Sequence, residues 1–335
     1  MRYFQFIGTQ RSGSNLLRVM LNQLPEISAP HPPHILKTFF PLLDRYGDLT
    51  DDRHFKALAT DVCDWVNLNP VSWEPYQALI DEVLVQVKSR DLLGLFIAIS
   101  EGKARQDKAG VMCCKSMESV SYVSTIEAAG LRPIYIHLFR DGRDVALSFT
   151  KAVVGPKHIY ALAQKWRKDQ QEALEARRLI PTERFVSLRY EDLIADPEKT
   201  LRDLCQALAV EFREEMLQYF EAGESKRTAH AGRMWENLER PVMSSNQKKF
   251  LKAFTSEQLI VFESVAGDVL KELGYSLVSD PSLLRKEFLP EEIRFFEQEN
   301  QRLIQEALAS ADPEDLRKRK PQENLLKSIL NRKNG

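Results

Sequence analysis

The chain has 335 residues, 43% hydrophobic and 28% charged, which is enough to bury a full core. Its 47 basic and 48 acidic residues leave a net charge of −1, so composition excludes general attraction to nucleic acid or to an anionic membrane, and any cationic site must be local. No apolar run approaches the ~20 residues of a membrane span, and no signal peptide is evident. We therefore expect a cytoplasmic protein without a membrane span or a nucleic-acid partner.

The N-terminal stretch predicts a strand, a turn and a helix. An aromatic and β-branched run at residues 3–7 stops at Gly8, and from Ser14 apolar residues recur at helical spacing until Pro25. The turn between them, Gly8-Thr-Gln-Arg-Ser-Gly13, has glycines five apart. Such a loop presents backbone N–H groups and a helix N-terminus to one point, which favours a phosphate-like anion.

This loop departs from the nucleoside triphosphate pattern. Ser14 stands where the phosphate-binding Lys would be, Asn15 replaces the magnesium-holding hydroxyl, and the cation lies inside the loop as Arg11. The loop resembles the 5′-phosphosulfate loop of sulfotransferases, which use 3′-phosphoadenosine 5′-phosphosulfate (PAPS) and need no metal. The resemblance implies that the cofactor is PAPS, without a metal, and that the following residues bind it: Arg11, Ser12, Gly13, Ser14, Asn15 and Leu16.

Residues 25–108 are expected to border the site. Three prolines around His31 forbid a helix there and fix an extended path that also carries His34. From about residue 39 to residue 108 the pattern is mostly helical. We interpret this segment as an insertion that packs over the sheet edge and helps to wall the acceptor pocket.

Further strands are predicted at residues 110–115, 133–139 and 184–190, each followed by helical sequence. Strands alternating with helices predict an α/β fold with a parallel sheet, and the resemblance implies a P-loop-like fold with a central parallel five-stranded sheet flanked by helices. We expect a catalytic domain at 1–278 and a charged helical C-terminal extension at 279–335, whose basic run 317–320 is expected to be solvated.

A second motif follows the strand at 133–139. Arg140, Asp144 and Ser148 are spaced so that a guanidinium group and a hydroxyl can meet one phosphate. The three residues are similar to the 3′-phosphate motif of sulfotransferases. On its own, Arg140 would be a strand-end cation paired with a neighbouring Asp.

Two later segments also resemble the family. Tyr190 begins a Tyr-Glu-Asp-Leu segment whose tyrosine approaches the nucleotide. Pro241-Val242 followed by Lys249-Phe250 is similar to the nucleotide-closing loop of tyrosylprotein-type and bacterial sulfotransferases. The resemblance assigns Lys249 to phosphate and Arg233 or Trp235 to the adenosine side.

The general base is not given by the motifs. In cytosolic sulfotransferases a histidine follows a Lys-Thr pair, whereas here Lys115-Ser116 is followed by Met117 and Glu118. The substitute is His31 or His34, because imidazole titrates near neutral pH, and Glu118 is the reserve.

The sequence therefore predicts a PAPS-dependent sulfotransferase that acts on a hydroxyl or amine of a small-molecule, lipid or carbohydrate acceptor. One alternative is a non-catalytic PAPS-binding scaffold. The other is an ATP-dependent P-loop kinase, which Ser14 and Asn15 disfavour. The acceptor and the oligomeric state stay open.

Overall fold

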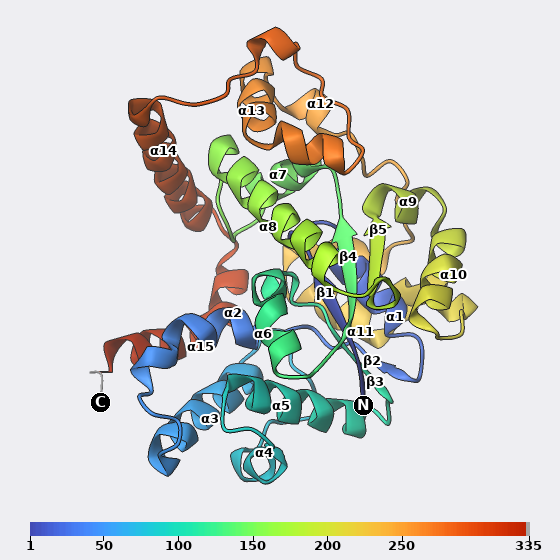
Figure 1. Ribbon diagram of the computed structural model, residues 1–335, viewed down its shortest axis with the longest axis vertical. Coiled ribbons are helices and arrows are strands. Elements are labelled where there is room, and N and C mark those ends of the chain that lie inside the picture. Colours follow the sequence, from blue (N-terminus) through green and yellow to red (C-terminus); the bar gives the residue numbers. More distant parts are fainter. Residues whose placement is uncertain (333–335) are drawn as a thin grey trace.

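The structure is a computed structural model that describes residues 1–332. A five-stranded, all-parallel sheet forms its centre, in the order β2-β3-β1-β4-β5. The predicted parallel five-stranded sheet flanked by helices is confirmed (Figure 1). The strands are β1 Arg2–Ile7, β2 Ile27–Ser28, β3 Val111–Cys114, β4 Ile134–Phe139 and β5 Phe185–Arg189.

Strand β2 has only two residues, in the proline-rich segment, and no hydrophobic pattern could reveal so short an element. It forms the sheet edge beside β3.

Helices cover both faces of the sheet (Figure 1). They are α1 Ser14–Leu21, α2 Ile35–Phe39, α3 Asp52–Asn67, α4 Ile80–Gln86, α5 Leu92–Gln106, α6 Val123–Ala128, α7 Gly142–Thr150, α8 Ile159–Leu179, α9 Tyr190–Ala195, α10 Pro197–Leu208, α11 Gly223–His230, α12 Phe250–Ala253, α13 Ser256–Glu272, α14 Pro290–Ala309 and α15 Pro313–Asn331. Short 3-10 helices lie at Phe40–Arg45, Met117–Tyr122, Thr182–Arg184, Glu214–Glu221, Arg233–Glu239 and Pro281–Leu283.

The alternation of side chains along β1 divides the core. Tyr3 and Ile7 face the helices of the insertion, α2 to α5, whereas Phe4 and Phe6 face α1, α10 and α11. All four side chains are buried, so the loop that follows β1 starts from a strand packed on both faces.

The C-terminal segment returns to the body of the protein. Helix α14 packs on α8, and α15 lies beside α3 of the insertion, where Ile329 joins the hydrophobic core (Figure 1). The predicted extension at 279–335 consists mainly of the helices α14 and α15, and its residues 333–335 lie outside the described part of the chain. A domain boundary at residue 278 stays a prediction.

Within residues 1–332, none of the helices is both long enough and apolar enough to cross a membrane.

Candidate functional site

A large pocket of about 1090 Å³ opens where β1, β3 and β4 end. Gln10 and Arg11 follow β1, Lys115 follows β3 and Arg140 follows β4, and all four line the pocket. The carboxyl ends of parallel strands share one edge of the sheet, which is where ligands gather in open α/β folds. The size of the pocket suits a nucleotide together with a second substrate.

The loop after β1 forms one wall. Arg11 has a φ of 70° and Gly13 a φ of 89°, so two residues of the loop, separated by Ser12, adopt left-handed backbone conformations. A Cβ at Gly13 would overlap the ring of Tyr190, which lies against the loop. Helix α1 begins at Ser14, and the backbone N–H groups of its first turn have no partner within the helix.

The predicted loop residues divide into two groups. Gly13, Ser14, Asn15 and Leu16 line the pocket. The side chain of Ser12 is fully buried, and its hydroxyl donates to the carbonyl of Thr9 at 2.8 Å, so Ser12 shapes the loop.

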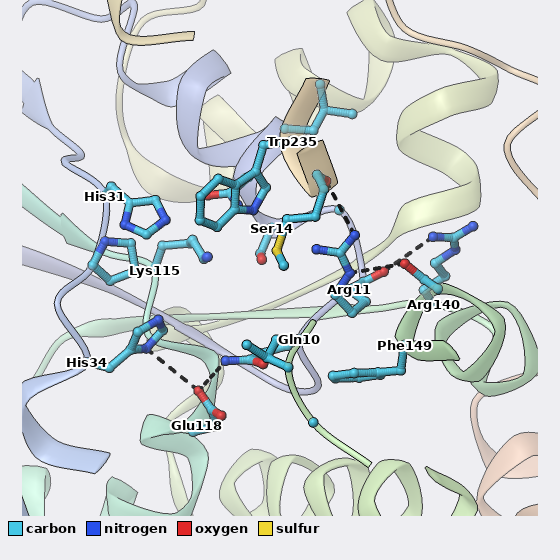
Figure 2. A pocket seen from close by; sticks show the side chains of 18 of the residues that line it. Gln10, Arg11, Ser14, His31, His34, Lys115, Glu118, Arg140, Phe149 and Trp235 are labelled. Atoms are coloured by element: carbon cyan, nitrogen blue, oxygen red, sulfur yellow. Dashed lines mark hydrogen bonds and ion pairs between the residues drawn. The ribbon is translucent and has the colours of Figure 1, made fainter. Parts of the chain in front are cut away.

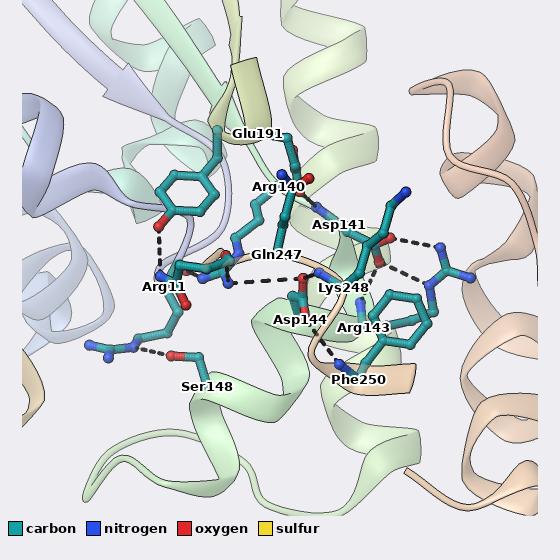
Figure 3. A network of polar contacts seen from close by, with 12 residues as sticks. Arg11, Arg140, Asp141, Arg143, Asp144, Ser148, Glu191, Gln247, Lys248 and Phe250 are labelled. Carbon is teal, nitrogen blue, oxygen red and sulfur yellow. Dashed lines mark hydrogen bonds and ion pairs between the residues drawn. The ribbon is translucent and has the colours of Figure 1, made fainter. Parts of the chain in front are cut away.

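Two arginines, Arg11 and Arg140, lie near each other beside this loop (Figure 3). Arg11 Nε donates to Ser148 Oγ at 3.0 Å, and Arg140 Nη1 donates to the carbonyl of Arg11 at 3.3 Å. The Arg140 guanidinium lies 4.5 Å from the centre of the Tyr190 ring, and its Nε is buried without a hydrogen-bond partner in the described chain. Burial, together with the charge of Arg140, lowers the pKa of Arg11 to about 10. An anion between these groups would relieve both the repulsion and the unpaired N–H.

Asp144 fixes the segment that carries Lys249. Its carboxylate accepts from the backbone N–H groups of Lys248 at 2.6 Å and Phe250 at 3.1 Å (Figure 3). Asn246 Nδ2 donates to the Tyr190 hydroxyl at 2.7 Å. Lys249 consequently lines the pocket near the other predicted nucleotide residues. Asp144 therefore positions a loop, a task that the motif spacing did not reveal.

Of the two residues predicted for the adenosine side, Arg233 and Trp235, the structure describes the side chain of Trp235 only. The side chain of Arg233 lies outside the described residues. The ring of Trp235 is edge-on to the ring of His31, with centroids 4.9 Å apart. Figure 2 shows the Trp235 ring beside the ring of His31.

His31 and His34 both line the pocket, on the segment between β2 and α2. Two indole N–H groups hold this segment: Trp73 donates to the carbonyl of His31 and Trp65 to that of Pro33, both at 2.6 Å. The two ring nitrogens of His31 are buried without partners in the described chain. Burial, reinforced by Lys115 and other nearby cations, places the pKa of His31 well below its usual value.

His34 faces Glu118 (Figure 2). Its Nδ1 lies 3.7 Å from Glu118 Oε2, which also accepts from Gln10 Nε2 at 2.7 Å, while Lys37 pairs with Glu118 Oε1. Burial lowers the pKa of His34 to about 4, although Glu118 opposes that shift. Burial opposes ionisation of Glu118 too, but His34 and Lys37 hold its pKa below the usual range. At neutral pH the pair is thus an uncharged imidazole beside a carboxylate.

Several pocket cations were not singled out from the sequence, among them Lys115 and Arg319. Lys115 ends β3 and is buried, and burial together with the charge of Arg18 lowers its pKa to about 7. The charged residue at a strand end was the signal for it. Arg319 belongs to the basic run that was expected to be solvated, yet it lines the pocket from α15 and is only partly exposed. No local pattern distinguishes Arg319 from its neighbours.

Across residues 1–332, no group of three or more His, Cys, Asp or Glu residues is arranged to hold a metal ion.

Comparisons with known proteins agree with this geometry. A family model described as "Sulfotransferase family" matches residues 5–214, more than half of the chain. The sulfotransferase domain from the curacin biosynthetic pathway superposes with a TM-score of 0.57 and 19% identity, over 83% of this chain and 99% of that one. The sulfotransferase domain of the Synechococcus PCC 7002 olefin synthase superposes with a TM-score of 0.54 and 22% identity, over 83% of this chain and 95% of that one. At these identities the structural likeness establishes the fold alone. A search of curated protein sequences gives no match.

Proposed function

Because the chain belongs to the sulfotransferase family, we propose that it transfers the sulfuryl group of PAPS to a hydroxyl or amine. The acceptor is a small molecule, lipid or carbohydrate, and the reaction takes place in the cytoplasm. One observation carries the proposal: Arg11 and Arg140 lie side by side with Ser148 and Tyr190, and Arg140 Nε is buried and unpaired.

The donor site follows from these cations. We assign the N–H groups at the start of α1 and the Arg11 guanidinium to the 5′-phosphosulfate, and Arg140 and Ser148 to the 3′-phosphate; their shared place on the pocket wall supports this assignment. Tyr190 offers a ring against Gly13 and Arg140. PAPS, when bound, supplies the sulfuryl group and a phosphate leaving group.

The chemistry requires a stabilised leaving group and a proton acceptor. As the acceptor oxygen forms its bond to sulfur, the bond from sulfur to the bridging oxygen breaks and its electron pair passes to the 5′-phosphate. Arg11 and the loop N–H groups stabilise that charge in place. The acceptor's proton passes to a neutral imidazole and then to solvent.

His34 is the better placed of the two candidate bases. Its Nδ1 faces Glu118 at the ion-pair distance of 3.7 Å and has no hydrogen-bond partner within residues 1–332, so the carboxylate acts on the imidazolium ion through its charge. His31 has no carboxylate near its ring and is surrounded by cations, which disfavour its protonated form. We therefore assign proton transfer to His34, with Glu118 as a positioning residue.

The test is calorimetric titration with 3′-phosphoadenosine 5′-phosphate (PAP), AMP, and ATP with magnesium. We expect PAP to bind tightest, and Arg140→Ala to weaken PAP about 100-fold while changing AMP far less, since a charge-assisted phosphate contact is worth roughly 1.5–3 kcal/mol. Arg177→Ala, on the exposed face of α8, is the matched control and should leave affinity unchanged.

Two outcomes of this titration contradict the proposal. A preference for ATP with magnesium would support the kinase alternative. If PAP binds but an activity assay detects no turnover of any acceptor, and His34→Ala leaves PAP affinity unchanged, the non-catalytic scaffold is supported.

A further inference from the structure

Helix α15 delivers a cation to the acceptor side of the pocket. The helix is held in place from outside that pocket: Arg332 pairs with Asp61 of α3 at 2.5 Å, and Ile329 is buried. Gln322 Nε2 donates to the carbonyl of Trp65 at 2.7 Å, close to the pocket wall. Arg319, one turn before Gln322, is therefore set at the pocket by fixed contacts of its own helix.

The charge of Arg319 is not neutralised locally. Burial lowers the pKa of Arg319, and Asp315 and Glu323 of the same helix act in the opposite direction. No carboxylate within residues 1–332 lies within 4.0 Å of its guanidinium group. Its guanidinium lies 5.9 Å from the centre of the Trp235 ring, a weak cation–π contact.

Three of the lysines that line the pocket are paired. Lys37 pairs with Glu118, Lys165 with Asp169 at 3.1 Å, and Lys168 approaches Glu172 at 3.8 Å. Arg319, the buried Lys115 and the exposed Lys151 thus line the pocket without an ion-pair partner in the described chain. A pocket wall with surplus positive charge favours an anionic ligand.

His31 supplies a second, independent sign of a ligand. Its side chain is 6% exposed, lines the same pocket, and leaves both ring nitrogens without partners among residues 1–332. It also lies against Trp235, which Arg319 covers. A neutral imidazole always offers one N–H, and a buried N–H without a partner is costly unless a ligand accepts from it.

We propose that the acceptor carries an anionic group, a carboxylate or a phosphate ester, which binds at Arg319 and the His31 ring beside Trp235. The acceptor's nucleophile then extends toward Lys115, His34 and the sulfuryl group. This inference rests on the proposed function for its meaning, but the anion site can be measured without any turnover.

The experiment uses the full chain labelled with 5-fluorotryptophan and saturated with PAP, so that the donor phosphate sites are filled. The chain has four tryptophans, and Trp235→Phe assigns the fluorine signal of Trp235. Inorganic phosphate, propionate and uncharged propionamide are titrated in turn at constant ionic strength. We expect phosphate or propionate, but not propionamide, to shift the Trp235 signal saturably, and the tighter of the two identifies the anionic group.

Two variants localise the effect. Arg319→Gln should weaken the anion at least tenfold, and Arg319→Lys, which keeps the charge but loses the planar fork, should fall between it and the parent. Arg317→Gln is the matched control, because Arg317 is exposed on the same helix and pairs with Glu314. It should stay within twofold of the parent.

The inference is overturned if no anion shifts the signal saturably, or if the shift persists unchanged in both Arg319 variants. PAP calorimetry on each variant reports folding and the donor site separately. Failure of PAP to bind would therefore count against the proposed function, whereas the Arg319-dependent shift in nucleotide-free protein would still test the anion site.

Discussion

The two halves of the pocket are built in different ways. The half that we propose binds the donor comes from short continuous segments at strand ends, residues 8–16 after β1 and 140–148 after β4. The acceptor half is assembled from residues 31–34, 65–70 and 319–322, which are far apart in the chain. Binding of a common donor is thus encoded in local motifs, whereas recognition of an acceptor depends on how distant segments pack.

The halves differ in electrostatics as well. The Arg140 guanidinium donates to the backbone carbonyl of Arg11, and its charge lowers the pKa of Arg11. Asp144, 4.0 Å from Arg140, accepts mainly from backbone N–H groups. On the acceptor side, Glu118 and Asp169 neutralise Lys37 and Lys165. The donor half is therefore poised for two anions, and the acceptor half for proton transfer with limited surplus charge.

The largest expected effect separates chemistry from donor binding. His34→Ala should lower kcat about 10²- to 10⁴-fold, the usual contribution of a general base, with the PAP dissociation constant unchanged. Single-turnover kinetics with any acceptor that the parent uses, beside PAP calorimetry, measures both quantities. Glu118→Gln, which keeps the shape but removes the orienting charge, should cost about tenfold in kcat. A loss of PAP affinity in His34→Ala would contradict the separation of donor binding from proton transfer.

Arg18 tests how the acceptor segment is anchored. It is fully buried and donates to the Ala29 carbonyl at 2.8 Å, Thr228 Oγ1 at 2.7 Å and Glu224 Oε1 at 2.6 Å. Arg18→Met should reduce the free energy of unfolding by about 3–5 kcal/mol, because Glu224 loses its buried partner and keeps only the exposed Arg227 at 3.0 Å. Urea denaturation measures this. The double variant Arg18→Met/Glu224→Met should be more stable than the single one, and equal or lower stability would contradict the assigned cause.

Gly13 tests the close packing of the donor loop. Gly13→Ala should weaken PAP binding about 100-fold, since the new Cβ overlaps Tyr190 and displaces the ring or the loop, at roughly 1–3 kcal/mol of strain. Gly130→Ala is the control: its φ of 78° is also left-handed, but no atom lies within 4 Å of the added Cβ. Calorimetry should show unchanged PAP affinity in Gly130→Ala. Similar losses in both variants would attribute the effect to backbone strain alone.

Lys115 should make donor binding depend on pH. Its pKa is lowered to about 7, so raising the pH through 7 removes a positive charge that lies close enough to Arg11 to interact with it. PAP affinity should accordingly fall above pH 7, at most about tenfold per pH unit. Titrations from pH 6 to 9 measure the bend, and Lys115→Met should abolish it. A bend that survives in Lys115→Met would belong to another group.

The smallest effect concerns a single hydroxyl. Ser148→Ala removes the acceptor of the 3.0 Å hydrogen bond from Arg11 and one predicted phosphate contact, so PAP should weaken roughly fivefold, equivalent to about 1 kcal/mol. Ser148→Thr keeps the hydroxyl and should restore most of the affinity. Equal affinities for the parent and Ser148→Ala would remove Ser148 from the donor site.

Much of the donor half could be predicted because its signals are local. Each signal spans only a few residues: the spacing of Gly8 and Gly13, the strand that ends in their turn, and the interval from Arg140 to Ser148. The fold converts them directly into geometry, since parallel strands bring their ends to one edge. The sequence also marked His31 and His34 through the prolines that stiffen their segment.

The sequence by itself determined the α/β class, the parallel sheet and the identity of the residues that converge after β1 and β4. Tertiary structure alone decided that His34 faces Glu118, that Asp144 holds the segment before Lys249, and that Arg319 leaves solvent to line the pocket. The physical reason is contact distance along the chain. Periodicity and turn chemistry act over a few residues, whereas the packing of α15 against α3 depends on contacts between segments about 270 residues apart.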